Sequence, residues 1–223
     1  LSGRLSENAS GNLSPKQIEI ARNIVGAGEY LLDLINDILD LSKIEAGKMV
    51  LVNETFKVAG LLDDVIATIQ PIAIKNKNAV ELACEGDLGA ITADMTKLRQ
   101  SVLNVLSNAC KFTANGRVTI SAGRRVENER EWIVLSIADT GIGMSAAQME
   151  HLFENFSQAN ADTVHKYGGT GLGMAISKKF CMMMGGDIDA MSAPKKGSTF
   201  VIRIPTRPDK ATGATLQISN SAA

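Results

Sequence analysis

The segment GGTGLG at Gly168–Gly173 decides how the rest of this 223-residue sequence is interpreted. It leads into a predicted helix, Thr170–Gly185, and the free amide hydrogens at a helix start favour an anion such as a triphosphate. The GxxxxGK[ST] pattern of a Walker loop is absent, and Met174 stands where the dinucleotide pattern GxGxxG would need its last glycine. Alone, the segment would also fit a plain glycine-rich hinge.

A second motif, DTGIG at Asp139–Gly143, follows the apolar run Ile133–Ala138, so Asp139 is expected at the buried end of a strand. A buried carboxylate needs hydrogen-bond donors, and the exocyclic amine of adenine is one candidate. Gly141 and Gly143 would let the backbone come close to a flat ring. A strand-end Asp before a glycine turn is common, so this motif is weak evidence by itself.

Further upstream, Asn104 and Asn108 lie four residues apart on a predicted amphipathic helix, Met95–Lys111, which aligns both amides on one face. An amide oxygen is a hard, neutral ligand suited to Mg²⁺, and Lys111 could reach phosphates as a mobile cation. Two Asn residues that merely solvate a helix face are an equally good interpretation. The three motifs in this order together predict a nucleotide site.

Composition and charge exclude several classes of protein. A net charge of −1 with scattered Lys and Arg argues against a nucleic-acid partner. The apolar runs are far below the ~18 residues that span a bilayer, and the N-terminus lacks a signal pattern, so we expect no membrane contact and a cytoplasmic location. Cys84, Cys110 and Cys181 are widely spaced and favour buried reduced thiols. Because the sequence begins without Met, we expect an excerpt of a longer protein.

A long helix is expected from Ser14-Pro15 to about Gly47, with apolar residues along one stripe. A helix of ~30 residues extends ~45 Å, so we interpret its stripe as a dimer or helical-hairpin interface, with an ordinary core helix as the alternative. The other expected elements are strands at Lys48–Phe56, Val80–Glu85, Ala90–Thr92, Arg117–Arg124, Trp132–Asp139, Asp187–Ser192 and Ser198–Ile204, and helices at Val58–Lys75, interrupted by Pro71, and Ala146–Phe153.

The organisation that follows has three parts: a partial dimerisation region at 1–47, a catalytic region at 48–207, and a flexible tail or linker at 208–223. The mostly polar connection from Thr140 to Gly168 is long for a compact domain, which favours a role as a lid.

Five segments resemble, in sequence order, the nucleotide-binding motifs of sensor histidine kinases, whose superfamily includes gyrase, the heat-shock chaperone ATPase and mismatch-repair ATPases. These are LRQSVLNVLSNACKFT (Leu98–Thr113), DTGIGM (Asp139–Met144), LFENFSQ (Leu152–Gln158), YGGTGLGMAISK (Tyr167–Lys178) and GSTFVIRIP (Gly197–Pro205). LLDLINDILDLSKIEAGKM (Leu31–Met49) also resembles the second helix of the dimerisation and phosphoacceptor hairpin.

The resemblance implies a two-layer α/β sandwich of the Bergerat type, with a mixed sheet, helices on one face, and ATP held with Mg²⁺ beneath a mobile lid. It implies Asn108 as the magnesium ligand with Asn104 beside it, Asp139 as acceptor for the adenine amine, and Thr199 near the base. The remaining implied ATP-binding residues are Lys111, Gly141, Gly143, Met144, the lid anchors Phe153 and Phe156, Lys166, Tyr167, Gly169, Thr170, Gly171, Leu172 and Gly173.

One departure from the family concerns the acceptor histidine, which the family carries on the first hairpin helix in a pattern like HELRTPL. It is missing, since the only histidines are His151 and His165, in or beside the lid. We therefore expect transfer of the ATP γ-phosphoryl group to a His of another segment or chain, within a homodimer formed by the N-terminal helix. A response-regulator receiver domain would be the next partner.

A second departure lies in the lid, where His165 precedes Lys166 at a position that is often Arg in relatives, so its charge would depend on pH. The amide at Asn104, where ATP-hydrolysing cousins carry a Glu base, disfavours hydrolysis relative to transfer and gives Asn104 and Lys111 the catalytic roles. Two alternatives stay open: a nucleotide-binding dimerisation module without catalysis, and a gyrase-like ATPase.

Overall fold

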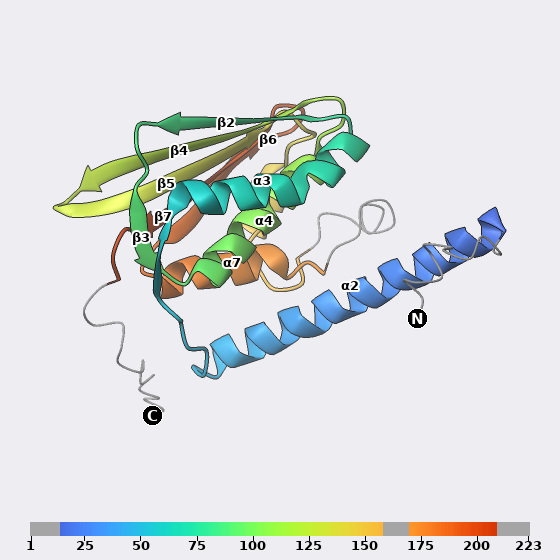
Figure 1. Cartoon of the computed structure of the whole chain (residues 1–223), viewed down its shortest axis with the longest axis horizontal. Helices are drawn as coiled ribbons and strands as arrows, with labels where there is room; N and C mark the ends of the chain where they lie inside the picture. Colours follow the sequence, from blue (N-terminus) through green and yellow to red (C-terminus); the bar gives the residue numbers. More distant parts are fainter. Residues whose placement is uncertain (1–13, 158–169, 209–223) are drawn as a thin grey trace.

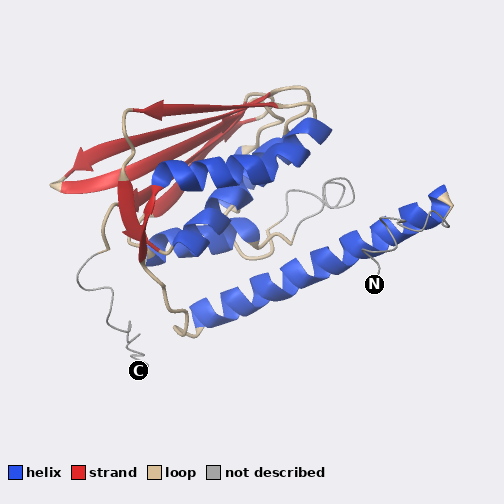
Figure 2. Cartoon of the chain, in the orientation of Figure 1, coloured by secondary structure: helices blue, strands red, loops and turns tan. Residues whose placement is uncertain are grey.

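The computed structural model describes residues 14–157 and 170–208 of the chain. Its main body is a five-stranded sheet covered on one face by helices, with a long helix beside this layer (Figure 1; Figure 2). In chain order the elements are α2 (Pro15–Glu45), β1 (Glu54–Lys57), α3 (Val58–Lys75), β2 (Ala79–Glu85), β3 (Ala90–Ala93), α4 (Met95–Phe112), β4 (Arg117–Glu127), β5 (Arg130–Asp139), α5 (Ala146–Glu150), α7 (Gly173–Met183), β6 (Asp187–Ala193) and β7 (Gly197–Pro205).

The sheet has the strand order β2-β4-β5-β7-β6. Strand β2 is parallel to β4, and the other neighbours are antiparallel, so the sheet is mixed. A separate two-stranded sheet joins β1 to β3. The predicted two-layer α/β sandwich with helices on one face is confirmed.

The core lies between the sheet and helices α3, α4 and α7. Alternate residues of β4 and β5 face these helices, as the period of two in a strand requires. The inward-facing side chains on these two strands are Val118, Ile120, Ala122, Ile133, Leu135 and Ile137. This packing fixes the strand ends and helix starts that carry the predicted motifs.

Helix α2 begins with a capping box, in which the Ser14 hydroxyl accepts from the Gln17 amide and the Gln17 side chain accepts from the Ser14 amide. Ala21 and Leu41 are its only buried side chains among the described residues. Near its C-terminal end it packs beside α7, and much of its apolar stripe, including Ile24 and Leu31, is exposed. The prediction that so long a helix would not lie wholly against one domain is therefore confirmed.

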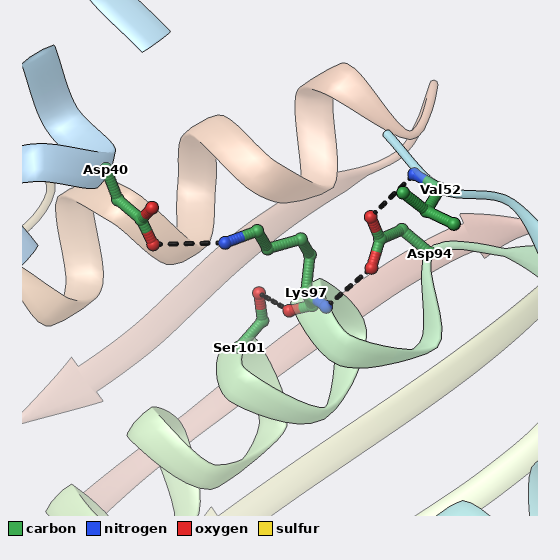
Figure 3. Close-up of polar contacts among 5 residues, drawn as sticks. All are labelled: Asp40, Val52, Asp94, Lys97 and Ser101. Carbon is green, nitrogen blue, oxygen red and sulfur yellow. Dashed lines mark hydrogen bonds and ion pairs between the residues drawn. The ribbon is translucent and has the colours of Figure 1, made fainter. Parts of the chain in front are cut away.

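A group of polar contacts ties α2 and the segment after it to the start of α4 (Figure 3). Asp94 caps α4, because one carboxylate oxygen accepts from the Lys97 amide while the other accepts from the Val52 amide, both at 2.9 Å. The Lys97 side chain reaches Asp40 of α2 at 3.0 Å and lies over the Phe180 ring. Asp94 and Lys97 thus fix how α2 and the segment after it meet the helical layer that covers the sheet.

Several predicted boundaries are wrong. The strand expected at Lys48–Phe56 is only β1, because the preceding residues have no neighbouring strand and Val52 bonds Asp94 instead. Helix α7 begins at Gly173 rather than Thr170, since Gly171 takes a left-handed φ of 70°. Helix α5 ends at Glu150, before the predicted Phe153. Pro71 lies inside α3 without interrupting it.

Candidate functional site

A cleft of 1710 Å³ lies where α2, α4, the segment after β5 and the start of α7 meet. Residues predicted from three separate motifs of the sequence converge on it. The predicted site residues that line it are Asn104, Asn108, Lys111, Asp139, Gly143, Met144, Phe156, Thr170, Gly171 and Gly173.

Helix α4 contributes the two amides. Asn104 and Asn108 are half-buried one turn apart, on the border between the buried face of the helix and the cleft. The Asn104 amide nitrogen donates to the carbonyl oxygen of Gly173 and to the Ser177 hydroxyl, both at 3.1 Å. Because a carbonyl oxygen only accepts, these contacts fix the orientation of the amide and leave its oxygen on the other side.

Asp139 ends β5 and is 8% exposed, which confirms the predicted burial. Burial raises the pKa of its carboxyl, while hydrogen bonds from the Gly141 amide, the Ser198 amide and hydroxyl, and the Thr113 hydroxyl act in the opposite direction. The Gly141 amide lies 2.8 Å from the carboxylate and the Thr113 hydroxyl 3.4 Å. Donors from three elements therefore hold the carboxylate in one position.

The glycines after Asp139 are required by packing. A Cβ on Gly141 would lie 2.4 Å from the Phe112 carbonyl oxygen, and Gly141 itself does not line the cleft. Gly143 has a φ of 65°, and a Cβ there would lie 1.9 Å from the Ala193 carbonyl oxygen. Both glycines thus have a structural reason to be glycine that does not depend on the predicted approach to a base.

The start of α7 closes another side of the cleft. The Thr170 hydroxyl accepts from the Leu172 amide and donates to Asp37 of α2 at 2.8 Å. A Cβ on Gly173 would lie 3.3 Å from the Asn104 amide nitrogen, closer than side chains usually pack. The glycines therefore let the first turn of α7 approach α4.

Lys111 lies in the last turn of α4 and lines the same cleft. Burial lowers the pKa of its amine, and the nearby charge of Asp33 on α2 raises it. A partly desolvated cation beside Asn108 is suited to attract an anion.

Four described residues predicted for the site do not line the cleft: Gly141, Phe153, Leu172 and Thr199. Leu172 is fully buried in the core. Phe153 lies beneath the Lys178 amine, 5.1 Å from the ring centre. Lys166, Tyr167 and Gly169, together with His165 and most of the predicted lid, lie outside the described residues.

Thr199 does not line the cleft, whereas its two neighbours in β7 do. Ser198 is paired with Asp139 in the register of β5 and β7, and Ser198 and Phe200 line the cleft while Thr199 alternates to the other face. Sequence reasoning missed Ser198 and Thr113 as partners of Asp139. The alternation of a strand could have found Ser198, whereas the contact of Thr113 depends on the end of α4 meeting the end of β5.

The acidic, histidine and cysteine side chains of the described residues include no group of three or more that could hold a metal ion. Asn108 lines the cleft, and a neutral amide oxygen together with water and phosphate oxygens is a ligand set that suits Mg²⁺. None of the helices within residues 14–157 and 170–208 has the length and apolar character to cross a membrane.

Comparisons with known proteins identify the domain. Residues 93–208 match the family model of histidine kinase-, DNA gyrase B- and HSP90-like ATPases. The sensor protein GacS of Pseudomonas syringae is 41% identical over 196 residues, which is 86% of this chain and 21% of GacS. The circadian input-output histidine kinase CikA of Synechococcus elongatus is 38% identical over 208 residues, which is 92% of this chain and 27% of CikA. The chain thus spans only a quarter or so of these relatives.

Solved structures show the same fold. Full-length ShkA in complex with AMPPNP superposes with a TM-score of 0.75 at 30% identity, covering 94% of this chain and 42% of ShkA. The histidine kinase AdeS of Acinetobacter baumannii gives a TM-score of 0.67 at 23% identity, covering 92% of both chains. ThkA in complex with the response regulator TrrA superposes with a TM-score of 0.63 at 21% identity, covering 94% of this chain and 57% of the matched chain.

Proposed function

Because this chain belongs to the family of histidine kinase-, DNA gyrase B- and HSP90-like ATPases, we propose that it is the catalytic region of a sensor histidine kinase. It would transfer the γ-phosphoryl group of ATP to a histidine on a dimerisation helix, for relay to an aspartate of a response regulator. The observation that carries this proposal is the meeting of Asn108, Asp139 and the Thr170–Gly173 segment at one cleft.

The adenine end of the nucleotide would lie against Asp139. Its carboxylate already accepts from Gly141, Ser198 and Thr113, so it is positioned before any ligand binds. A remaining lone pair would accept from the exocyclic amine of adenine. Met144 and Phe200, which line the same part of the cleft, would add apolar contact with the ring.

The phosphate end would lie between α4 and the start of α7. The Asn108 amide oxygen would hold Mg²⁺, which neutralises phosphate charge when bound. Lys111 would contact the phosphates as a cation, and the backbone amides of Thr170, Gly171 and Gly173 would donate to them. We assign Lys166, Tyr167, Gly169 and the aromatic residues Phe153 and Phe156 to the lid on the basis of the family resemblance.

Transfer is favoured over hydrolysis because of Asn104. An amide cannot act as the general base that activates water, and its nitrogen is engaged by Gly173 and Ser177. An imidazole is nucleophilic when neutral, so alignment and charge stabilisation suffice for transfer.

Two partners follow from the proposal. Exposed apolar side chains of α2 would pack in a dimer through this helix; they include Ile24, Leu31, Ile35 and Ile38. A response-regulator receiver domain would take the phosphoryl group from the histidine, and the structure of ThkA with TrrA is consistent with such a partner for a related kinase.

The test is transfer in trans. The chain is mixed with γ-labelled ATP, Mg²⁺ and a helical hairpin that carries an acceptor His, and label on the hairpin is measured. We expect acid-labile label that disappears when that His is changed to Gln or when Asp139 is changed to Asn. Nucleotide binding without labelled hairpin would support a non-catalytic binding module instead. Rapid phosphate release without label would support a gyrase-like ATPase.

A further inference from the structure

Three carboxylates form a row on the face of α2 that looks into the cleft. Asp33, Asp37 and Asp40 are spaced by four and three residues, which places them on one side of the helix. All three line the cleft that Asn108, Lys111 and Asp139 also line. The long helix therefore brings negative charge to the wall opposite the nucleotide-binding motifs.

Two carboxylates of the row contact polar groups of the catalytic domain, and the third acts on one through its charge. Asp40 pairs with Lys97 at 3.0 Å, and the two side chains are only 17% and 16% exposed. Asp37 accepts from the Thr170 hydroxyl at 2.8 Å. Asp33 lies close enough to Lys111 for its charge to raise the pKa of that amine.

These contacts differ in their relation to the nucleotide. Lys97 is absent from the cleft lining, so a ligand in the cleft need not displace the lysine to which Asp40 anchors α2. Thr170 and Lys111, in contrast, line the end of the cleft to which we assign the phosphates. Asp37 bonds one of these groups and Asp33 acts on the other through its charge.

The row is also under mutual repulsion. The pKa of Asp37 is raised first by burial and then by the charges of Asp33 and Asp40, against the hydrogen bond from Thr170. Two further cations, Lys43 and Arg99, also line the cleft. A guanidinium nitrogen of Arg99 lies 3.8 Å from a carboxylate oxygen of Asp64 on α3. Additional negative charge placed between Asp37 and Lys111 would meet repulsion that a neutral ligand would not.

We propose that Asp33 and Asp37 are specificity determinants of the cleft, which disfavour a bound nucleotide in proportion to the charge of its phosphate chain while α2 is docked. This inference rests on the proposed function, because it assigns the phosphates to the Lys111 end. A triphosphate and the docked α2 then compete for Lys111 and Thr170. Binding of ATP would loosen α2 around its Asp40–Lys97 anchor, whereas adenosine would leave it in place.

The test compares ligands of increasing charge on one variant. The double variant Asp33→Asn, Asp37→Asn removes two charges, and the amide oxygen that it introduces on α2 can still accept from Thr170. Calorimetry with adenosine, Mg-ADP and Mg-ATP gives three dissociation constants for the full chain. We expect the double variant to bind ATP roughly tenfold more tightly than the wild type does. Its affinity for ADP should rise by a smaller factor, and its affinity for adenosine should change by less than about twofold.

A matched control separates local from overall charge. Glu19→Gln, Glu29→Gln removes two charges from the same helix at exposed positions that do not line the cleft. We expect this control to shift ATP affinity by less than about twofold, because exposed distant charges are screened.

Four outcomes would overturn the inference. Equal gains for ATP and adenosine, or no change for either, would show that the row does not act on phosphate charge. Weaker ATP binding in the double variant would show that the carboxylates help to hold the metal or nucleotide. A wild-type chain that binds none of the three ligands would overturn the proposed function as well, so the two failures are distinguishable.

Discussion

The Asn104 amide on α4 donates to the carbonyl oxygen of Gly173, the first residue of α7, across 3.1 Å. Ser177 strengthens this contact, since its hydroxyl accepts from Asn104 and donates to the same carbonyl at 2.7 Å. The residue to which we assign the preference for transfer over hydrolysis therefore also joins the two helices that flank the cleft. Its chemistry and its structural role cannot be changed independently.

The variant Asn104→Asp tests the hydrogen bond that joins α4 to α7. It turns a donor facing the Gly173 carbonyl into an acceptor, and breaking a buried hydrogen bond in this way costs about 1–3 kcal/mol. Urea unfolding measures the destabilisation. Asn53→Asp adds the same charge at an exposed position and should stay within about 0.5 kcal/mol of wild type. Equal stability of the two variants would mean that the hydrogen bond contributes nothing.

The resemblance to a known family predicted the layer architecture, and the three motifs predicted that residues of α4, β5 and the start of α7 would form one site. Alternation and helical periodicity were enough to predict which face of each element is buried. The sequence did not predict that Ser198 rather than Thr199 lines the cleft, because this depends on which residue stands opposite Asp139. The contacts of Asp33, Asp37 and Asp40 were not predicted at all, since they depend on how α2 docks, which no local pattern specifies.

The close approach at Gly143 predicts a large effect of one methyl group. In Gly143→Ala the new Cβ would meet the Ala193 carbonyl at 1.9 Å, in a left-handed backbone. Strain and overlap together should destabilise the protein by at least about 3 kcal/mol.

A control for Gly143 lies in α2. Gly26 is inside this helix and has open space around it, so Gly26→Ala should instead stabilise the helix by about 0.5–1 kcal/mol. Thermal unfolding followed by circular dichroism compares the two variants. A Gly143→Ala protein as stable as the wild type would contradict the packing described for this loop.

Asp94 should matter for both α4 and the segment after α2. Its two oxygens accept from Lys97 and Val52, and the side chain is 4% exposed. Asp94→Asn has one accepting oxygen, so one amide loses its partner at a cost of about 1–2 kcal/mol. We expect the backbone amide of Val52 or that of Lys97 to exchange its hydrogen faster in the variant than in the wild type. Unchanged protection at both amides would refute this role.

The three cysteines should differ in reactivity. Cys84 is exposed, contrary to the expectation of three buried thiols, whereas burial raises the pKa of Cys110 to about 11 and that of Cys181 to about 12. At pH 8 a thiol reagent should label Cys84 quickly and the other two only after unfolding. Rapid labelling of all three in the native protein would contradict the described packing.

The raised pKa values of Cys110 and Cys181 predict how the free energy of unfolding changes at high pH. Both thiols lose their protons more readily when unfolded, so the stability they contribute is complete below the ordinary value of 9.0. It is lost as the pH rises from there towards about 12. Replacing Cys110 and Cys181 by Ala should flatten the fall in unfolding free energy over this range, and an unchanged slope would contradict the assignment.

Calorimetry of Mg-ATP binding to the wild type and to Asp139→Asn tests the central claim most directly. An Asn side chain cannot accept from Gly141, Ser198, Thr113 and adenine at once, because one of its two ends donates. We expect the wild type to bind Mg-ATP and the variant to bind at least about 100-fold more weakly, with Asp63→Asn, an exposed change on α3, binding like the wild type. Equal affinity of wild type and Asp139→Asn, or no binding by the wild type, would contradict the account.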